Sequence, residues 1–198
     1  MLVRSSQELD TFYRFGLMPT YRHKETGKRF FFIHIPRTAG RFIQENIRLN
    51  GYEAEQDIWK TIDGVEISHF HRELYQKYLD VENIEHIAII RDPVDRYISL
   101  KSYSFYPKGW FRPQVDYITS ITHLWNFEDG FGEDFGSWMS EKLQIKFNVK
   151  ELDTSFLYNT RGQPLYLEYC DPEYKKIVKT KDIEEYVRNF YRLDRDLI

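Results

Sequence analysis

The chain has 198 residues and a formal net charge of −3, with 41% hydrophobic and 30% charged residues. This composition is typical of a soluble globular protein, and the length suits one domain, residues 1–198. The slightly negative charge argues against broad, non-specific binding to nucleic acid, so we expect any anion site to be local.

Membrane insertion and secretion are not expected from the sequence. No apolar stretch approaches the roughly 18 residues of a transmembrane helix. The first residues, MLVRSSQELDTFYRFG, lack the apolar segment of a secretory signal. A lone cysteine, Cys170, excludes an internal disulfide and fits a reducing compartment. We therefore expect a cytoplasmic protein with no membrane partner.

The first predicted unit is a strand followed by a helix. A polar, basic stretch at residues 1–29 ends in a turn-like segment at residues 25–28. The apolar run at residues 30–35 predicts a strand, and the amphipathic pattern at residues 41–49 predicts a helix that Gly51 ends.

The loop inside this unit, residues 36–40, reads PRTAG and is followed by Arg41. Free backbone N–H groups at a helix start favour an anion, and arginines such as Arg37 bind phosphate or sulfate oxygens in a fork. This pattern predicts an anion site, and the alternative is an ordinary turn with exposed arginines.

A histidine pair follows. We expect a short strand at residues 65–68 and a helix at residues 73–79, and the stretch between them reads ISHFHREL. In an extended segment His69 and His71 point the same way. They are candidate bases, and the alternatives are a surface pair or a metal site with a third ligand. Because no ligand-spaced Cys/His cluster is present, we predict no metal.

The second predicted unit repeats the strand and helix. Residues 87–90 form an apolar run typical of a buried parallel strand, and Asp92 suits the cap of the helix that follows. Arg91 directly follows the strand, and Ser99 lies two helical turns later. Together they are placed to bind one phosphate. The alternative is an ion pair of Arg91 with Asp92 or Asp95 and a packing role for Ser99.

The rest of the chain is less regular. Residues 104–140 predict an aromatic-rich insertion or lid, residues 159–164 a loop, and residues 182–192 a final helix. Five insertion aromatics are candidates for stacking on an acceptor or for packing a small core: Trp110, Phe111, Tyr117, Trp125 and Trp138. Two strand–loop–helix units predict an α/β fold with three layers, a central parallel sheet flanked by helices.

The two loops together resemble a known family. HIPRTAGRF looks like the 5′-phosphosulfate loop of sulfotransferases that use 3′-phosphoadenosine-5′-phosphosulfate (PAPS), and IIRDPVDRYIS looks like their 3′-phosphate motif. Asn159, Arg161 and the closing YRLDRDLI look like features of the carbohydrate-type members. The resemblance covers residues 30–105 well and residues 155–198 loosely. It implies a P-loop NTPase-like sulfotransferase fold.

The resemblance also implies which residues bind the donor. Arg91 and Ser99 would hold its 3′-phosphate. Arg37 stands where the family usually has lysine, keeps the charge, and could stabilise the leaving phosphate. The donor-binding set implied is Pro36, Arg37, Thr38, Ala39, Gly40, Arg41, Phe42, Arg91, Ser99, Asn159 and Arg161.

The implied reaction is transfer of a sulfuryl group from PAPS to an acceptor hydroxyl, most simply on a carbohydrate or small metabolite, without a metal. His69 or His71 would accept the hydroxyl proton, because a neutral imidazole is a suitable base near pH 7. Glu66 and Glu73 are weaker candidates. One alternative function is a catalytically degenerate nucleotide- or glycan-binding module. Another is a P-loop small-molecule kinase, although the loop is not GxxxxGK[ST]. The sequence leaves the acceptor and the oligomeric state open.

Overall fold

The structure is a computed structural model that describes residues 20–55, 61–62, 65–101, 108–152 and 181–197. Asn159, Arg161 and the loop at residues 159–164 lie outside the described residues, as does Cys170. The roles predicted for Asn159 and Arg161 therefore stay predictions.

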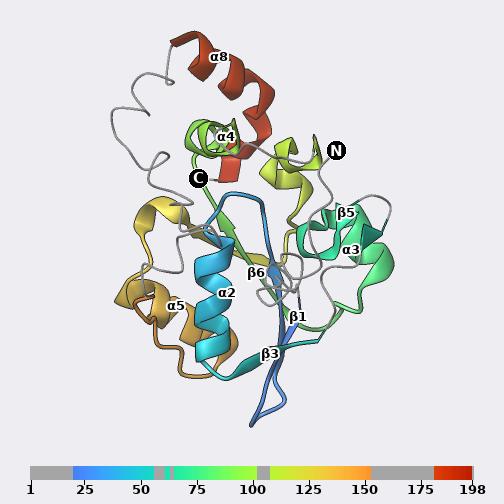
Figure 1. The fold of residues 1–198 in the computed structure, drawn as a ribbon, viewed down its shortest axis with the longest axis vertical. Coiled ribbons are helices and arrows are strands. Elements are labelled where there is room, and N and C mark those ends of the chain that lie inside the picture. Colours follow the sequence, from blue (N-terminus) through green and yellow to red (C-terminus); the bar gives the residue numbers. More distant parts are fainter. Residues whose placement is uncertain (1–19, 56–60, 63–64, 102–107, 153–180, 198) are drawn as a thin grey trace, which may run out of the picture.

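A five-stranded sheet forms the centre of the protein (Figure 1). Its strands are, in spatial order, β3 (Tyr52–Ala54), β1 (Thr20–His23), β2 (Arg29–Ile33), β6 (Glu85–Ile90) and β7 (Thr122–Asn126). β2 pairs in parallel with β6, and β6 in parallel with β7. A separate two-stranded ladder joins β4 (Thr61–Ile62) to β5 (Val65–Glu66).

The prediction of an α/β fold is confirmed, but the sheet is only partly parallel. β1 runs antiparallel to both β2 and β3. The reason is local: the turn predicted at residues 25–28 closes a hairpin, with the His23 N–H donating to Lys28 O at 2.8 Å. A hairpin places its two strands antiparallel, so the polar stretch before β2 supplies a strand that the sequence did not predict.

The main helices are α2 (Gly40–Leu49), α3 (Arg72–Tyr78), α4 (Pro93–Lys101), α5 (Glu133–Leu143) and α8 (Lys181–Phe190). Short 3₁₀ helices are η1 (Ile67–His69), η2 (Lys108–Phe111), η3 (Gln114–Asp116), η4 (Phe127–Asp129) and η6 (Arg192–Leu197). The helices predicted at residues 41–49, 73–79 and 182–192 are confirmed within a few residues. The segment at residues 104–140 contains β7, a strand of the main sheet, which the prediction of an insertion missed.

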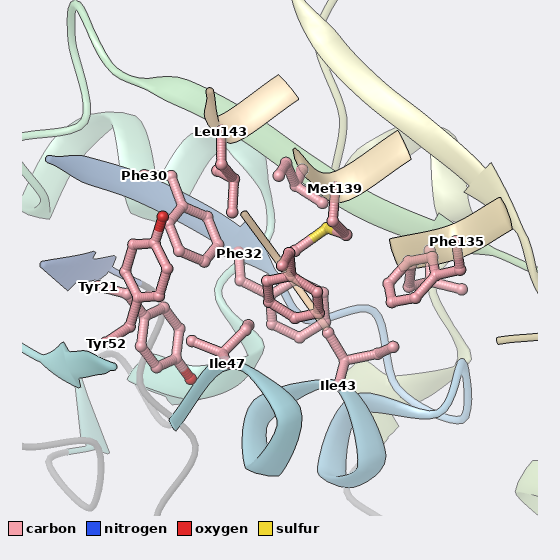
Figure 2. Close-up of a cluster of buried hydrophobic side chains, with 12 residues drawn as sticks. Tyr21, Phe30, Phe32, Ile43, Ile47, Tyr52, Phe135, Met139 and Leu143 are labelled. Carbon is pink, nitrogen blue, oxygen red and sulfur yellow. The ribbon is translucent and has the colours of Figure 1, made fainter. Parts of the chain in front are cut away.

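Alternating side chains of β2 and β6 build a core on each face of the sheet. Phe30 and Phe32 face α2 and α5, and Figure 2 shows Phe32 among Ile43 and Ile47 of α2 and Met139 of α5. The opposite face carries these buried residues: Phe31, Ile33, Ala88, Ile90 and, from α3, Tyr75. Helices therefore cover both faces, and the strands read as the continuous apolar runs that such burial requires.

The carboxyl ends of β2 and β6 lie side by side, because the two strands are parallel neighbours. The loop after β2 leads into α2, and the loop after β6 leads into α4 (Figure 1). α8 packs on α4 through a small cluster of Val94, Ile98, Val187 and Tyr191. This arrangement brings the C-terminal helix to the same end of the molecule as the two loops. Among the described residues, none of the helices combines the length and apolarity needed to cross a bilayer.

Candidate anion-binding site

The loop after β2 is curled tightly. Arg37 and Ala39 both adopt left-handed backbone conformations, with φ of 71° and 66°. The buried hydroxyl of Thr38 donates to Ile35 O at 2.8 Å and closes the curl. α2 then begins at Gly40 without a side-chain cap on its N-terminus. The loop thus delivers a helix start, where backbone N–H groups favour an anion, to the edge of the sheet.

The structure brings Arg37, Arg91 and Ser99 into direct contact. Arg91 Nη1 donates to Arg37 O at 3.2 Å, and Arg37 Nε donates to Ser99 Oγ at 2.9 Å. The Arg91 guanidinium also lies 4.2 Å from the centre of the Phe127 ring. The sequence predicted two anion-binding loops at one edge of the sheet, and hydrogen bonds join their arginines into one continuous basic cluster. The carboxyl ends of neighbouring strands are close enough for a single side chain to link them.

Asp92 acts as the predicted cap of α4. Its Oδ1 accepts hydrogen bonds from the backbone N–H groups of Val94 at 2.9 Å and Asp95 at 3.0 Å. A carboxylate at this position satisfies free N–H groups and favours the helix dipole. Arg91 and Asp92 therefore have different roles: the Asp92 carboxylate caps α4, whereas the Arg91 guanidinium binds the backbone of Arg37.

His34 is a site residue that the sequence reasoning missed. It follows β2, is buried, and packs its ring 4.6 Å from the ring of His69, which in turn lies 4.8 Å from that of Trp110. Burial holds the pKa of His34 well below its ordinary value, and the charges of His69, Arg41 and Arg37 act in the same direction. Its Nδ1 is buried without a hydrogen-bond partner. His34 is therefore neutral at pH 7, and its only sequence signal is its place at the end of a buried strand.

The two predicted histidine candidates lie in different surroundings. The expected extended segment is wrong: His69 ends η1 and His71 directly precedes α3, because the chain turns into a helix there. His69 Nδ1 lies 2.9 Å from Ser68 Oγ, and its ring faces His34 beside the loop after β2. His71 Nδ1 lies 3.9 Å from the exposed Glu73 carboxylate. Burial lowers the pKa of His71, the charge of Arg112 lowers it further, and Glu73 opposes them.

Arg96 is a second residue that the sequence reasoning missed. Its guanidinium is 1% exposed and donates to three backbone carbonyls: Pro36 O at 3.0 Å, Arg112 O at 3.0 Å and Trp110 O at 2.8 Å. Five N–H donors in a planar fork make arginine suited to joining several carbonyls. Arg96 thereby fixes the loop after β2 to the segment that carries Trp110. Nothing in the sequence separates it from an exposed helical arginine.

The predicted aromatic residues pack on neighbouring rings or into the hydrophobic cores. Phe42, in the first turn of α2, packs its ring 5.4 Å from that of Phe131. Trp125 and Trp138 pack against the core of the sheet, and Tyr117 is fully buried. Phe111 packs 5.9 Å from Tyr97. Trp110 is one of the five aromatics predicted either to stack on an acceptor or to pack a small core, and its ring contacts His69, a candidate base.

Comparison with protein families, with curated proteins and with solved structures finds no match to this chain. Within the described part of the chain, no group of three or more His, Cys, Asp or Glu side chains is arranged to hold a metal ion. The site is thus described by its own chemistry: arginines at a helix start, a serine hydroxyl, and a row of two histidine rings and a tryptophan ring in tilted contact.

Gly40 should be the least replaceable glycine of this site. A Cβ on Gly40 would lie 1.8 Å from His34 Nε2, and the ring is held between its neighbours. We expect Gly40→Ala to lower the free energy of unfolding by about 1–3 kcal/mol. Denaturant unfolding measures this. Gly132→Ala is the control, since nothing lies within 4 Å of its added Cβ. An equal cost of Gly40→Ala in a His34→Ala background would contradict the proposed clash.

His34 should make the stability depend on pH. Because its pKa is lowered in the folded state, the unfolded chain binds more protons, and stability falls as the pH drops below the ordinary histidine value of about 6.5. Between about pH 7 and about pH 5, we expect the free energy of unfolding to fall less steeply for the His34→Leu variant than for the wild type. Urea unfolding across this range measures the slopes. A residual slope is expected from His71, and parallel curves for the two proteins would contradict a neutral, buried His34.

Proposed function

We propose that the chain is a PAPS-dependent sulfotransferase that moves a sulfuryl group to an acceptor hydroxyl. One observation carries this proposal: Arg91, Arg37 and Ser99 are joined by hydrogen bonds between the loops after β2 and β6. These are the residues that the resemblance assigns to the two phosphates of the donor. Their meeting at one sheet edge is what a single bound nucleotide requires.

The residues present fit a nucleotide with two phosphate groups. The start of α2 has no side-chain cap, and Arg37 and Arg91 supply positive charge. In the proposal Arg91 and Ser99 bind the 3′-phosphate, and residues 36–42 surround the 5′ end. Because Arg37 Nε donates to Ser99 Oγ, the two proposed phosphate positions adjoin, and the Ser99 hydroxyl keeps its own O–H to donate to a phosphate oxygen.

The transfer forms a bond between the acceptor oxygen and sulfur and breaks the bond from sulfur to the bridging phosphate oxygen. The acceptor proton passes to a base, and we assign His69 because its ring lies between His34 and Trp110 beside the donor loop. Arg37 stabilises the negative charge that builds on the leaving bisphosphate. Alignment of donor and acceptor supplies most of the remaining rate enhancement.

The finer fold assignment belongs to the same proposal. Helices on both faces of the sheet, and loops at the carboxyl ends of parallel strands, support a three-layer, P-loop-like sulfotransferase fold. The second candidate function is a degenerate nucleotide-binding module, favoured by arginine at position 37 and by its contact with Ser99. A cytoplasmic location stays a prediction from the sequence.

Arg91→Ala should weaken binding of adenosine 3′,5′-bisphosphate, the product nucleotide. Loss of a charge-assisted hydrogen bond to phosphate costs about 1.5–3 kcal/mol, which corresponds to a Kd raised about 10- to 100-fold. Isothermal titration calorimetry at fixed ionic strength measures the change. Arg48→Ala is the matched control, because Arg48 is an exposed arginine that pairs with Glu45 on α2. An unchanged Kd for Arg91→Ala would contradict the 3′-phosphate assignment.

His69→Ala should reduce turnover and leave nucleotide binding intact. Loss of a general base typically lowers kcat by about 100-fold or more. Transfer of ³⁵S from labelled PAPS to a panel of hydroxyl acceptors measures kcat, and calorimetry measures the Kd of the bisphosphate. His71→Ala is the control, since that ring lies toward Arg112 and Glu73. If turnover is lost in His71→Ala and kept in His69→Ala, the general base is His71 rather than His69. Nucleotide binding without turnover in the wild type would favour the degenerate module.

A further inference from the structure

Gln114 is a buried side chain whose amide group binds both the backbone C=O and the backbone N–H of Arg91. Its Nε2 donates to Arg91 O at 2.8 Å, and its Oε1 accepts from the Arg91 N–H at 3.0 Å. The pairing of β6 with β2 ends at Ala88 and that with β7 ends at Ile90. Arg91 therefore lies one residue beyond the sheet ladder, and the Gln114 amide takes the place of a neighbouring peptide group.

Gln114 is itself held by the C-terminal end of the described chain. Asp194, in η6, is fully buried, and its carboxylate accepts from the Gln114 N–H at 2.9 Å and the Val115 N–H at 3.0 Å. Burial raises the pKa of Asp194, whereas these two donors and the charge of Arg96 favour its ionised form. Tyr191 adds a second tie, since its hydroxyl donates to Phe111 O at 2.7 Å. Hydrogen bonds to the side chains of Tyr191 and Asp194 thus hold the segment that carries Gln114 in place.

These contacts form one connected path, in which hydrogen bonds alternate with the backbone and side-chain atoms of Gln114 and Arg91. It runs from Asp194 through Gln114 to the backbone of Arg91, and from the Arg91 guanidinium to Arg37 O. We propose that Gln114 is a positioning residue, which sets the Arg91 guanidinium for phosphate binding under the control of the C-terminal Asp194. This inference rests on the proposed function, in which Arg91 binds the 3′-phosphate.

The protein offers a matched control for a purely structural role. Gln44, on α2, is also buried, but its side-chain N and O have no hydrogen-bond partner. Replacing either glutamine with methionine keeps the length of the side chain and removes its amide group. Only Gln114→Met removes bonds to Arg91, so a difference between the two variants reports on the positioning of Arg91 rather than on burial alone.

The test compares wild type, Gln114→Met and Gln44→Met by calorimetric titration with adenosine 3′,5′-bisphosphate, after cooperative thermal unfolding shows that each is folded. We expect Gln114→Met to raise the Kd about tenfold, from the loss of two hydrogen bonds, while Gln44→Met leaves it unchanged. Amide hydrogen exchange gives a second readout without nucleotide: the Arg91 N–H should exchange faster in Gln114→Met only. Should Gln114→Met fail to fold, Asp194→Asn replaces it and should raise the Kd at least threefold.

The outcomes separate the two proposals. Equal Kd values for all folded variants, with tight binding by the wild type, would overturn the positioning role and leave the proposed function standing. No binding by the wild type would overturn the proposed function, and the positioning role with it. Weaker binding by Gln114→Met and Gln44→Met alike would overturn the positioning role, because both losses would then come from burial.

Discussion

The parallel pairing of β2 with β6 is the constraint on which the site depends. It sets two strand ends beside each other, and from there the Arg91 guanidinium reaches Arg37 O and the Arg37 side chain reaches Ser99. If β2 and β6 were not neighbours in the sheet, the two basic loops would be unrelated surface features. The apolar cores on both faces of the sheet fix the register of this pairing, since a slip of one residue would turn every buried side chain of a strand to the other face.

Around this junction the protein keeps arginine cations and the neutral ring of His34 together. Burial is the main cause of the lowered pKa of His34, and the nearby charges of His69, Arg41 and Arg37 lower it further. A protonated His34 would add positive charge in a place without solvent, so its neutrality lets the ring pack on His69. The same residue fills the space above Gly40 that a side chain would need. The site thus combines a basic anion-binding edge with the buried, neutral ring of His34.

The sequence predicted those parts of the site whose signals lie within a few neighbouring residues. The buried runs of β2 and β6, the loop PRTAG and the cap Asp92 were recognised because strand, turn and cap signals lie within a few residues. β1 and β7 were missed, since neither shows a strong strand pattern and both depend on partners in the sheet. His69 and His71 were expected in an extended segment, yet His69 ends η1 and His71 directly precedes α3.

The missed residues share one property, which is that their role comes from contacts far along the chain. Arg96 reaches Pro36 across 60 residues, and Asp194 reaches Gln114 across 80. In the sequence each resembles an ordinary polar residue of a helix or turn. Only the folded chain shows that they are buried and that their hydrogen bonds hold the functional loops in place.

A crystal structure of the protein with adenosine 3′,5′-bisphosphate bound would test the proposed site most directly. We expect the 3′-phosphate within hydrogen-bonding distance of Arg91 and Ser99, and the 5′-phosphate at the start of α2 beside Arg37. A nucleotide bound elsewhere on the protein would contradict this placement.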